Sequence, residues 1–265
     1  MRYNKIKVIT DISLPFNFIG STIRGALGWN LKRVVCINPS FKCEGCFAKD
    51  NCLYFDMYER DFAKFRLSLK LGGEVEFEVF LFEELCEKTP YLLSAIHKMF
   101  ERGITKNNIK PLFLQIYLND TLIYDGEFKQ IKNTCLQPSE ITPKEKAFLK
   151  IITPIRIKEN NKFVRENIKL ETILRSIHHR FLKLQNKEIT KLPFSPKYEI
   201  ANKNLSFNDF SRYSNRQKTK MKLGGVIGNI NFSYIDEESF NLLKLGEIIG
   251  VGKQVTFGLG CIEVL

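Results

Sequence analysis

Apolar and polar residues follow two different periods along the first half of the chain. Alternation with a period of two predicts strands, and an apolar spacing of three to four residues predicts helices. The expected order is a strand at 5–14, a helix at 20–35, strands at 65–71 and 74–82, a helix at 91–103, and strands at 111–120 and 121–128. Gly72 and Gly73 lie between the second and third strands, as in a hairpin.

The second half repeats this order of elements, although its residues do not visibly repeat. The expected elements are a strand at 147–157, a helix at 167–187, strands at 198–207 and 224–234, a helix at 236–250 and a last strand at 254–265. Two β-α-β-β-α-β units in tandem indicate an α+β protein with two ferredoxin-like (RRM-like) domains. Prolines and polar residues at 136–146 place the junction there, giving predicted domains at 1–140 and 141–265.

Composition and charge narrow the class of protein. No apolar run approaches the length of a membrane span, so we expect a soluble cytoplasmic protein without a membrane partner. The net charge is +12, and residues 144–222 hold 20 basic against 7 acidic residues, so the excess lies in one region. Such a region favours a polyanion as partner. A solvated lysine-rich surface is the alternative.

Four of the seven cysteines form a cluster, Cys36, Cys43, Cys46 and Cys52, with the spacing C-x6-C-x2-C-x5-C. In a cytosolic protein, clustered thiolates favour a metal over disulfides. Four sulfurs suit tetrahedral zinc in a closed, structural site; an iron–sulfur cluster and a metal-free loop are the alternatives. We therefore expect a Cys-rich insertion at 36–52 in the first domain. The remaining cysteines, Cys86, Cys135 and Cys261, are expected in the core.

The three histidines are candidates for acid–base chemistry. His97 is expected to pack on a short amphipathic helix. His178 and His179 lie on the predicted helix at 167–187, where the helical period turns His179 and Arg175 away from the apolar stripe and places His178 on its flank. An imidazole beside an arginine could act as general base or acid; a solvated surface histidine is the alternative.

Two further segments suit contact with phosphates. The stretch SRYSNRQKTKMK at 211–222 combines five basic residues with Tyr213, which could stack on an unpaired base. The stretch GVGKQVTFGLG at 250–260 contains four glycines and Lys253. It lacks the third glycine of G-x-G-x-x-G and precedes a strand, so no nucleotide cofactor is expected.

These features together resemble a known family. The duplicated ferredoxin-like pattern ending in GVGKQVTFGLGCIEV resembles the RAMP superfamily of CRISPR-associated proteins. STIRGALGWNLKRVVC, the four cysteines, TPIRIK and RYSNRQKTKMKLGGVIG are similar to the CRISPR-associated endoribonucleases that process precursor CRISPR RNA. The resemblance implies cleavage of CRISPR repeat RNA without a catalytic metal, by attack of a ribose 2′-OH that leaves a 2′,3′-cyclic phosphate and a 5′-OH. It also implies other CRISPR-associated proteins or a second copy of the chain as further candidate partners.

One departure from that family affects the catalytic residues. Many members carry a histidine in or near the first helix, and residues 20–35 contain none. We therefore predict His179 and His178 as catalytic, with Lys253, Arg216 or Lys218 stabilising the phosphorane. Catalysis without histidine, by Tyr213 and lysine or arginine residues, is the alternative. The residues expected to contact RNA are Arg175, Arg212, Tyr213, Arg216, Gln217, Lys218, Lys220, Gly225, Gly252, Gly258 and Gly260. The alternatives are a non-catalytic RAMP subunit that binds guide RNA and a zinc-containing DNA-binding regulator.

Overall fold

The computed structural model describes residues 1–15, 18–130, 132–159, 161–214 and 219–265, and between 211 and 221 it describes the backbone alone. Two compact units make up the chain: Met1–Leu67 with Gly72–Gln137, and Ser68–Leu71 with Pro138–Leu265. The predicted division into domains between residues 140 and 141 stays a prediction. No helix within the described ranges combines the length and the apolar character that crossing a bilayer requires.

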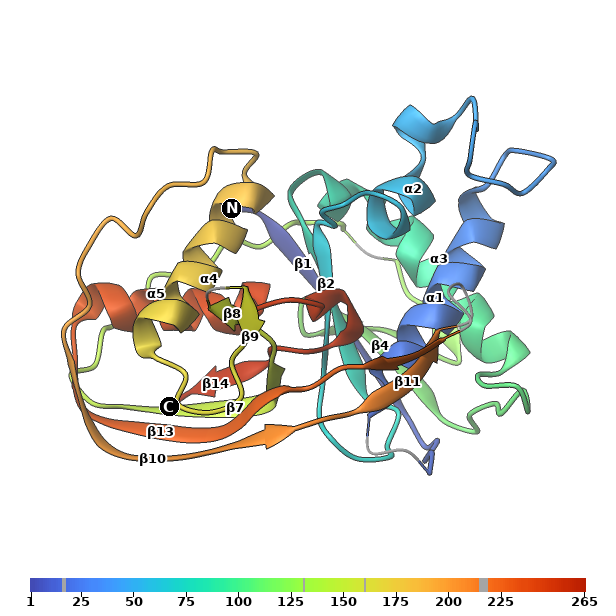
Figure 1. Ribbon diagram of the computed structural model, residues 1–265. Helices are drawn as coiled ribbons and strands as arrows, with labels where there is room; N and C mark the ends of the chain where they lie inside the picture. The colour runs from blue at the N-terminus through green and yellow to red at the C-terminus, as the bar shows by residue number, and fades with distance from the viewer. Residues whose placement is uncertain (16–17, 131, 160, 215–218) are drawn as a thin grey trace. The chain divides into compact units, whose positions relative to one another are not determined.

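The first unit contains a six-stranded sheet in the order β2-β3-β1-β4-β5-β6. Its elements are β1 (Tyr3–Thr10), α1 (Gly20–Val35), α2 (Leu53–Tyr58), β2 (Phe65–Leu69), β3 (Phe77–Phe82), α3 (Thr89–Arg102), β4 (Leu114–Leu118), β5 (Thr121–Asp125) and β6 (Glu127–Phe128). Alternate residues of β1, such as Ile6 and Val8, are fully buried. Helices α1 and α3 pack side by side (Figure 1). The strand order β4-β1-β3-β2 is that of a ferredoxin-like fold.

The second unit repeats this plan with a four-stranded sheet in the order β10-β13-β7-β14. Its elements are β7 (Ala147–Ile155), α4 (Leu170–Leu184), β10 (Tyr198–Asn208), β13 (Gly225–Ile235), α5 (Glu237–Ile249) and β14 (Ile262–Val264). Helices α4 and α5 pack against each other, and α5 contacts β14 (Figure 1). Asp236 caps α5 by accepting a hydrogen bond from the Ser239 backbone N–H, 2.9 Å away. The predicted α+β fold with two ferredoxin-like halves is confirmed.

Two short hairpins lie between the main elements of the second unit. β8 (Lys158–Glu159) pairs with β9 (Lys162–Phe163), and β11 (Ser211–Ser214) pairs with β12 (Thr219–Lys222). The first hairpin directly follows β7, and the second connects β10 to β13. Both therefore extend from strands of the sheet, and the first contains Lys158 and Lys162.

The predicted last strand is wrong in its first half. Residues Val255–Phe257 form a 3-10 turn, and β14 begins only at Ile262. Gln254, Gly258 and Gly260 all have positive φ, which an extended strand does not allow. Apolar residues alternate at 254–260 as they would in a strand, but these residues form a loop.

Candidate functional site

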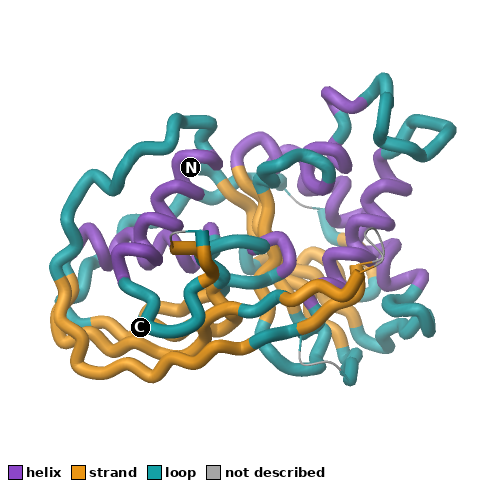
Figure 2. Tube along the Cα trace, viewed as in Figure 1, coloured by secondary structure: helices purple, strands orange, loops and turns teal. Residues whose placement is uncertain are grey.

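Helix α4 positions the two adjacent histidines. Its inner face is held in the core by Ile173, Ile177 and other apolar residues that are fully buried. Arg175 and His179, four residues apart, therefore lie together on another face of the helix. The chain after α4 runs without helix or strand until β10 begins at Tyr198 (Figure 2).

This connecting segment lies against α4 and forms an open groove with it. Glu171, Arg175 and His179 line one side, and residues 189–196 line the other. The Nε2 atom of His178 lies 3.2 Å from Oγ1 of Thr190. We call this site the histidine groove. Because residues 189–196 cover the helix here, both histidines are half-buried, whereas the helical period alone predicted an exposed His179.

The surroundings of His179 lower its pKa below the ordinary value. Burial is the main cause, and the nearby His178 and Arg175 act in the same direction by disfavouring a second positive charge. A hydrogen bond with the Thr190 backbone acts in the opposite direction. At neutral pH the imidazole of His179 is therefore neutral, which is the form that can accept a proton.

Lys253 lies in a different part of the second unit. Its backbone N–H donates a hydrogen bond to the carbonyl of Arg156, 2.8 Å away, and its side chain is exposed. The backbone N–H of Gly252 donates to the Ser176 hydroxyl of α4 at 3.0 Å. The predicted catalytic residues thus divide between two sites, with the histidines beside Thr190 and Lys253 beside Arg156.

The glycines of this loop serve close packing of the backbone. A Cβ at Gly260 would lie 1.8 Å from the carbonyl oxygen of Val251, and one at Gly252 would lie 2.7 Å from that of Arg156. A Cβ at Gly225 would meet the carbonyl oxygen of Ile155 at 2.5 Å. Gly225, Gly258 and Gly260 are buried within the unit. Their lack of a side chain is therefore used for internal contacts, and their predicted contact with RNA stays a prediction.

A second group of residues combines cations with aromatic rings, and it was missed from the sequence. Arg156 lies 3.8 Å from the ring centre of Phe163, and Lys158 lies 5.1 Å from it. Arg165 lies 5.2 Å from the ring centre of Phe207. We call these five residues the cation–aromatic cluster. The spacing of basic and aromatic residues in PIRIKENNKFVR could have indicated it, had the β8–β9 hairpin been foreseen.

Arg156 holds this cluster to the framework of the sheet. Its Nη1 atom donates a hydrogen bond to the carbonyl of Gly224, 2.9 Å away, at the residue before β13. Burial lowers the pKa of Arg156, and Asp209 partly offsets this effect. Arginine stays protonated even so, because its ordinary pKa is far above neutral. The guanidinium is thus a fixed, half-buried cation stacked on an aromatic ring.

The basic segment after β10 is described in part. Arg212 and Tyr213 lie in β11 and Lys220 lies in β12, and Tyr213 pairs with Lys220 across the hairpin. Lys222 forms an ion pair with Asp209 at 3.3 Å. The predicted RNA contacts Arg216, Gln217 and Lys218 lie outside the described residues. The predicted role of this segment stays a prediction.

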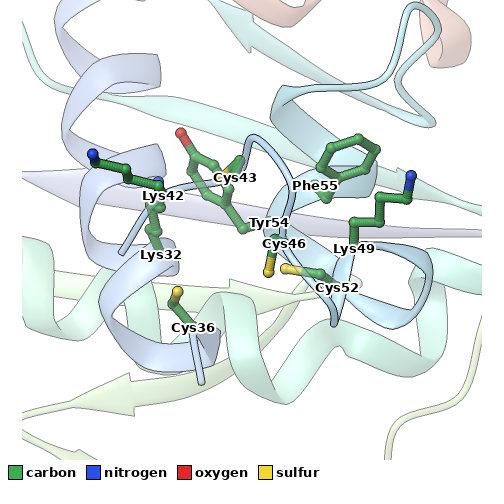
Figure 3. Close-up of a pocket in the computed structure, with 9 residues that line it drawn as sticks. All are labelled: Lys32, Cys36, Lys42, Cys43, Cys46, Lys49, Cys52, Tyr54 and Phe55. Carbon is green, nitrogen blue, oxygen red and sulfur yellow. The ribbon is translucent and has the colours of Figure 1, made fainter. Parts of the chain in front are cut away.

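The four clustered cysteines line one pocket of the first unit, between α1 and α2 (Figure 3). Lys32 and Tyr54 also line it. Burial disfavours the charge of Lys32, but a hydrogen bond to Cys43 and nearby acidic groups outweigh it, so the pKa of Lys32 is raised. Within the described ranges, no three His, Cys, Asp or Glu side chains are already arranged as metal ligands. That residues 36–52 are an insertion stays a prediction.

The other cysteines and the first histidine have structural surroundings. Cys86 and Cys261 are buried, as predicted, whereas Cys135 is only half-buried. His97 contacts Glu101 at 3.6 Å and packs edge-on against the ring of Tyr124. His97 therefore has the packing role that its helix predicted.

Comparison with known proteins shows what the second unit is similar to. Residues 149–262 match the sequence model of the family described as CRISPR-associated endoribonuclease Cas6. The matched range contains both the histidine groove and the cation–aromatic cluster. A second family model, described as an N-terminal domain, matches residues 2–68.

Similarity to known proteins also extends over the whole chain. An uncharacterized protein of Archaeoglobus fulgidus is 23% identical over 277 residues, which is 93% of this chain and 91% of that protein. A Cas6 product complex matches with a TM-score of 0.60 and 15% identity, over 100% of this chain and 99% of that one. A RAMP protein described as binding different RNA substrates matches with a TM-score of 0.50 and 12% identity, over 100% of both chains.

The predicted family resemblance is confirmed by the match of residues 149–262 to the Cas6 family model and by the fold that the whole chain shares with the Cas6 structure. At such low identity the solved structures show the fold alone, so the roles of individual residues depend on the geometry described above.

Proposed function

We propose that this protein is an endoribonuclease that cuts CRISPR repeat RNA, and that the histidine groove is its catalytic site. The observation that carries the proposal is the place of His179: it lies in an open groove beside Arg175, within the range that matches the Cas6 family. A neutral imidazole next to an arginine suits a reaction that needs a base and stabilisation of a developing anion.

In the proposed reaction, His179 takes the proton from the ribose 2′-OH. The 2′-oxygen then attacks the adjacent phosphorus, and the bond from phosphorus to the 5′-oxygen breaks. The leaving 5′-oxygen takes a proton, which His178 would supply; the two histidine rings lie 6.2 Å apart, centre to centre. The products are a 2′,3′-cyclic phosphate and a 5′-OH, and neither a metal ion nor water enters this balance. Arg175 and Lys191 would stabilise the negative charge on the phosphorane.

The cation–aromatic cluster suits binding of the same RNA. Phosphates can pair with Arg165 and Lys158, and unpaired bases can stack on the aromatic rings and on the plane of an arginine. The backbone N–H of Lys253 donates a hydrogen bond to the Arg156 carbonyl, so Lys253 lies next to this cluster. We therefore place Lys253 with the residues that bind RNA, whereas the sequence alone placed it at the phosphorane.

The test is cleavage of the protein's own repeat RNA in the presence of EDTA. We expect products with 2′,3′-cyclic phosphate ends, and no cleavage of an RNA with a single 2′-deoxyribose at the cut site. His179→Ala should slow single-turnover cleavage about 10²–10⁴-fold, the usual contribution of a positioned acid or base. His97→Gln, on the first unit, is the matched control and should cleave at the normal rate.

Two results would contradict the proposal. Cleavage of the 2′-deoxy RNA would exclude attack by the 2′-OH. Full activity of a His178→Ala/His179→Ala double variant would exclude the histidine groove as the catalytic site.

A non-catalytic RAMP subunit that binds guide RNA is the second candidate function. The observation that favours it is α1 (Gly20–Val35), which contains no histidine. A subunit of this kind would bind repeat RNA and leave it uncut under every condition tested. Binding without cleavage in the assay above would therefore select this function.

A further inference from the structure

Four cysteines of the first unit have no part in the proposed RNA chemistry. Cys36 directly follows α1, Cys43 and Cys46 lie in the loop, and Cys52 directly precedes α2. All four are half-buried, unlike the core residues Cys86 and Cys261. In Figure 3 the sulfurs of Cys46 and Cys52 point toward each other, and that of Cys36 points toward the same space. Thiols from two helix ends and one loop thus line one pocket.

We propose that these four cysteines bind one structural Zn²⁺ ion. Thiolate is the ligand that zinc prefers in structural sites, and four sulfurs complete its tetrahedral shell. A site closed by four protein ligands has no position for substrate, so the ion would hold the fold and take no part in cleavage.

The backbone between the cysteines already has a turn suited to a pair of metal ligands. The Cys46 N–H donates a hydrogen bond to the Cys43 carbonyl at 3.2 Å, which brings the two residues onto one side of the turn. Gly45, between them, has φ +65 and nothing within 4 Å of a Cβ position. Gly45 supplies the left-handed conformation that this turn requires, and the space beside it is open.

The charge around the pocket suits four thiolates. Zinc with four thiolates carries two net negative charges, which favour nearby cations. Lys32, Lys42 and Lys49 all line the pocket. The ammonium of Lys32 is held 4.8 Å from the ring centre of Tyr54 and 5.0 Å from that of Phe41. Lysines at these places stabilise the deprotonated ligands, and among the described residues that line the pocket there is no carboxylate to oppose them.

Binding requires the loop to close. No three donors of the described chain already surround one point, so the ion has to draw the sulfurs together. Residues 37–51 are mostly exposed and contain no α-helix or strand, so this movement disturbs no core contact. The ion would then join the end of α1 to the start of α2. We expect slower amide exchange and slower proteolysis of the loop in the loaded protein than in the metal-free protein.

The experiment measures metal in the full-length protein, purified without oxygen and without added chelator. Mass spectrometry of the metal should find about one zinc ion per chain, because four cysteines form one site. Replacement by Co²⁺ should give the intense visible bands of tetrahedral cobalt with thiolate ligands. A Cys43→Ser/Cys46→Ser variant should lose both signals, and Cys135→Ser, outside the pocket, should keep them.

Metal content and the cobalt spectrum are measured without RNA, so they test the zinc site independently of the proposed cleavage. The cobalt spectrum is recorded on the wild-type protein, so this test does not require any variant to fold. Protein without bound zinc that gives no cobalt spectrum would overturn the proposal. So would a brown protein containing iron and sulfide, or disulfides among the four cysteines in protein kept reduced throughout.

Discussion

Replacing Gly260 by alanine tests the packing of the glycine-rich loop. Gly260 has φ +70, and its N–H and carbonyl bond to the Pro154 carbonyl at 3.0 Å and to the Val251 N–H at 2.9 Å. A left-handed conformation costs an ordinary residue about 1–2 kcal/mol. The new Cβ would lie 1.8 Å from the Val251 carbonyl oxygen, so the loop must move and both hydrogen bonds weaken. At about 0.5–1.5 kcal/mol for each bond, the total loss of stability is about 2–5 kcal/mol.

The matched control is Gly126→Ala. Gly126 has φ +83, a similar backbone conformation, but nothing lies within 4 Å of its Cβ position. Only the conformational cost of about 1–2 kcal/mol applies there. The free energy of unfolding should be measured for both variants from urea titrations followed by far-ultraviolet circular dichroism. Equal losses in the two variants would refute the reasoning, because they would show that the space around Gly260 has no effect.

Three further predictions concern the groups with unusual surroundings. Because the pKa of His179 is lowered, the loss of cleavage on acidification should begin below pH 6.5, and Arg175→Ala should move this loss to higher pH; an unmoved acidic limb of kcat/KM would count against His179 as base. Arg165→Ala should lower the slope of log binding constant against log salt concentration by about one, because one phosphate contact is lost. Phe207→Leu should weaken RNA binding by about 1–3 kcal/mol and leave that slope unchanged. Equal slopes in the two variants would contradict this prediction. Burial raises the pKa of the Cys86 thiol, with Cys135 adding to the effect, so native protein should resist alkylation at Cys86 at pH 8; rapid labelling there would disprove it.

The helices and the order of the strands could be predicted because each element keeps a regular spacing of apolar residues over many positions. α1 occupies Gly20–Val35, the range that the sequence predicts, and α4 differs from its predicted range only at the ends. The last strand could not be predicted correctly. Its apolar residues alternate as in a strand, but positive φ at Gln254 and Gly258 bends the chain, and side-chain periodicity does not report φ.

The candidate site was predictable only where one helix presents it. The period of α4 places Arg175 and His179 on one face. It does not show that residues 189–196 return to that face, because such a loop has no period. The same limit hid the partner of Phe207, since Arg165, which lies over its ring, comes from another segment of the chain.

The edge of the second sheet has a consequence for how the protein behaves in concentrated solution. β10 pairs with β13 on one side only, and most of its eleven residues are exposed. A long open edge invites the strands of other molecules. Around Ile200, however, the register is interrupted twice, and Lys203 adds a charge further along the strand. An uneven, charged edge is a poor template for another chain, so the irregular pairing at Ile200 helps this protein to resist aggregation.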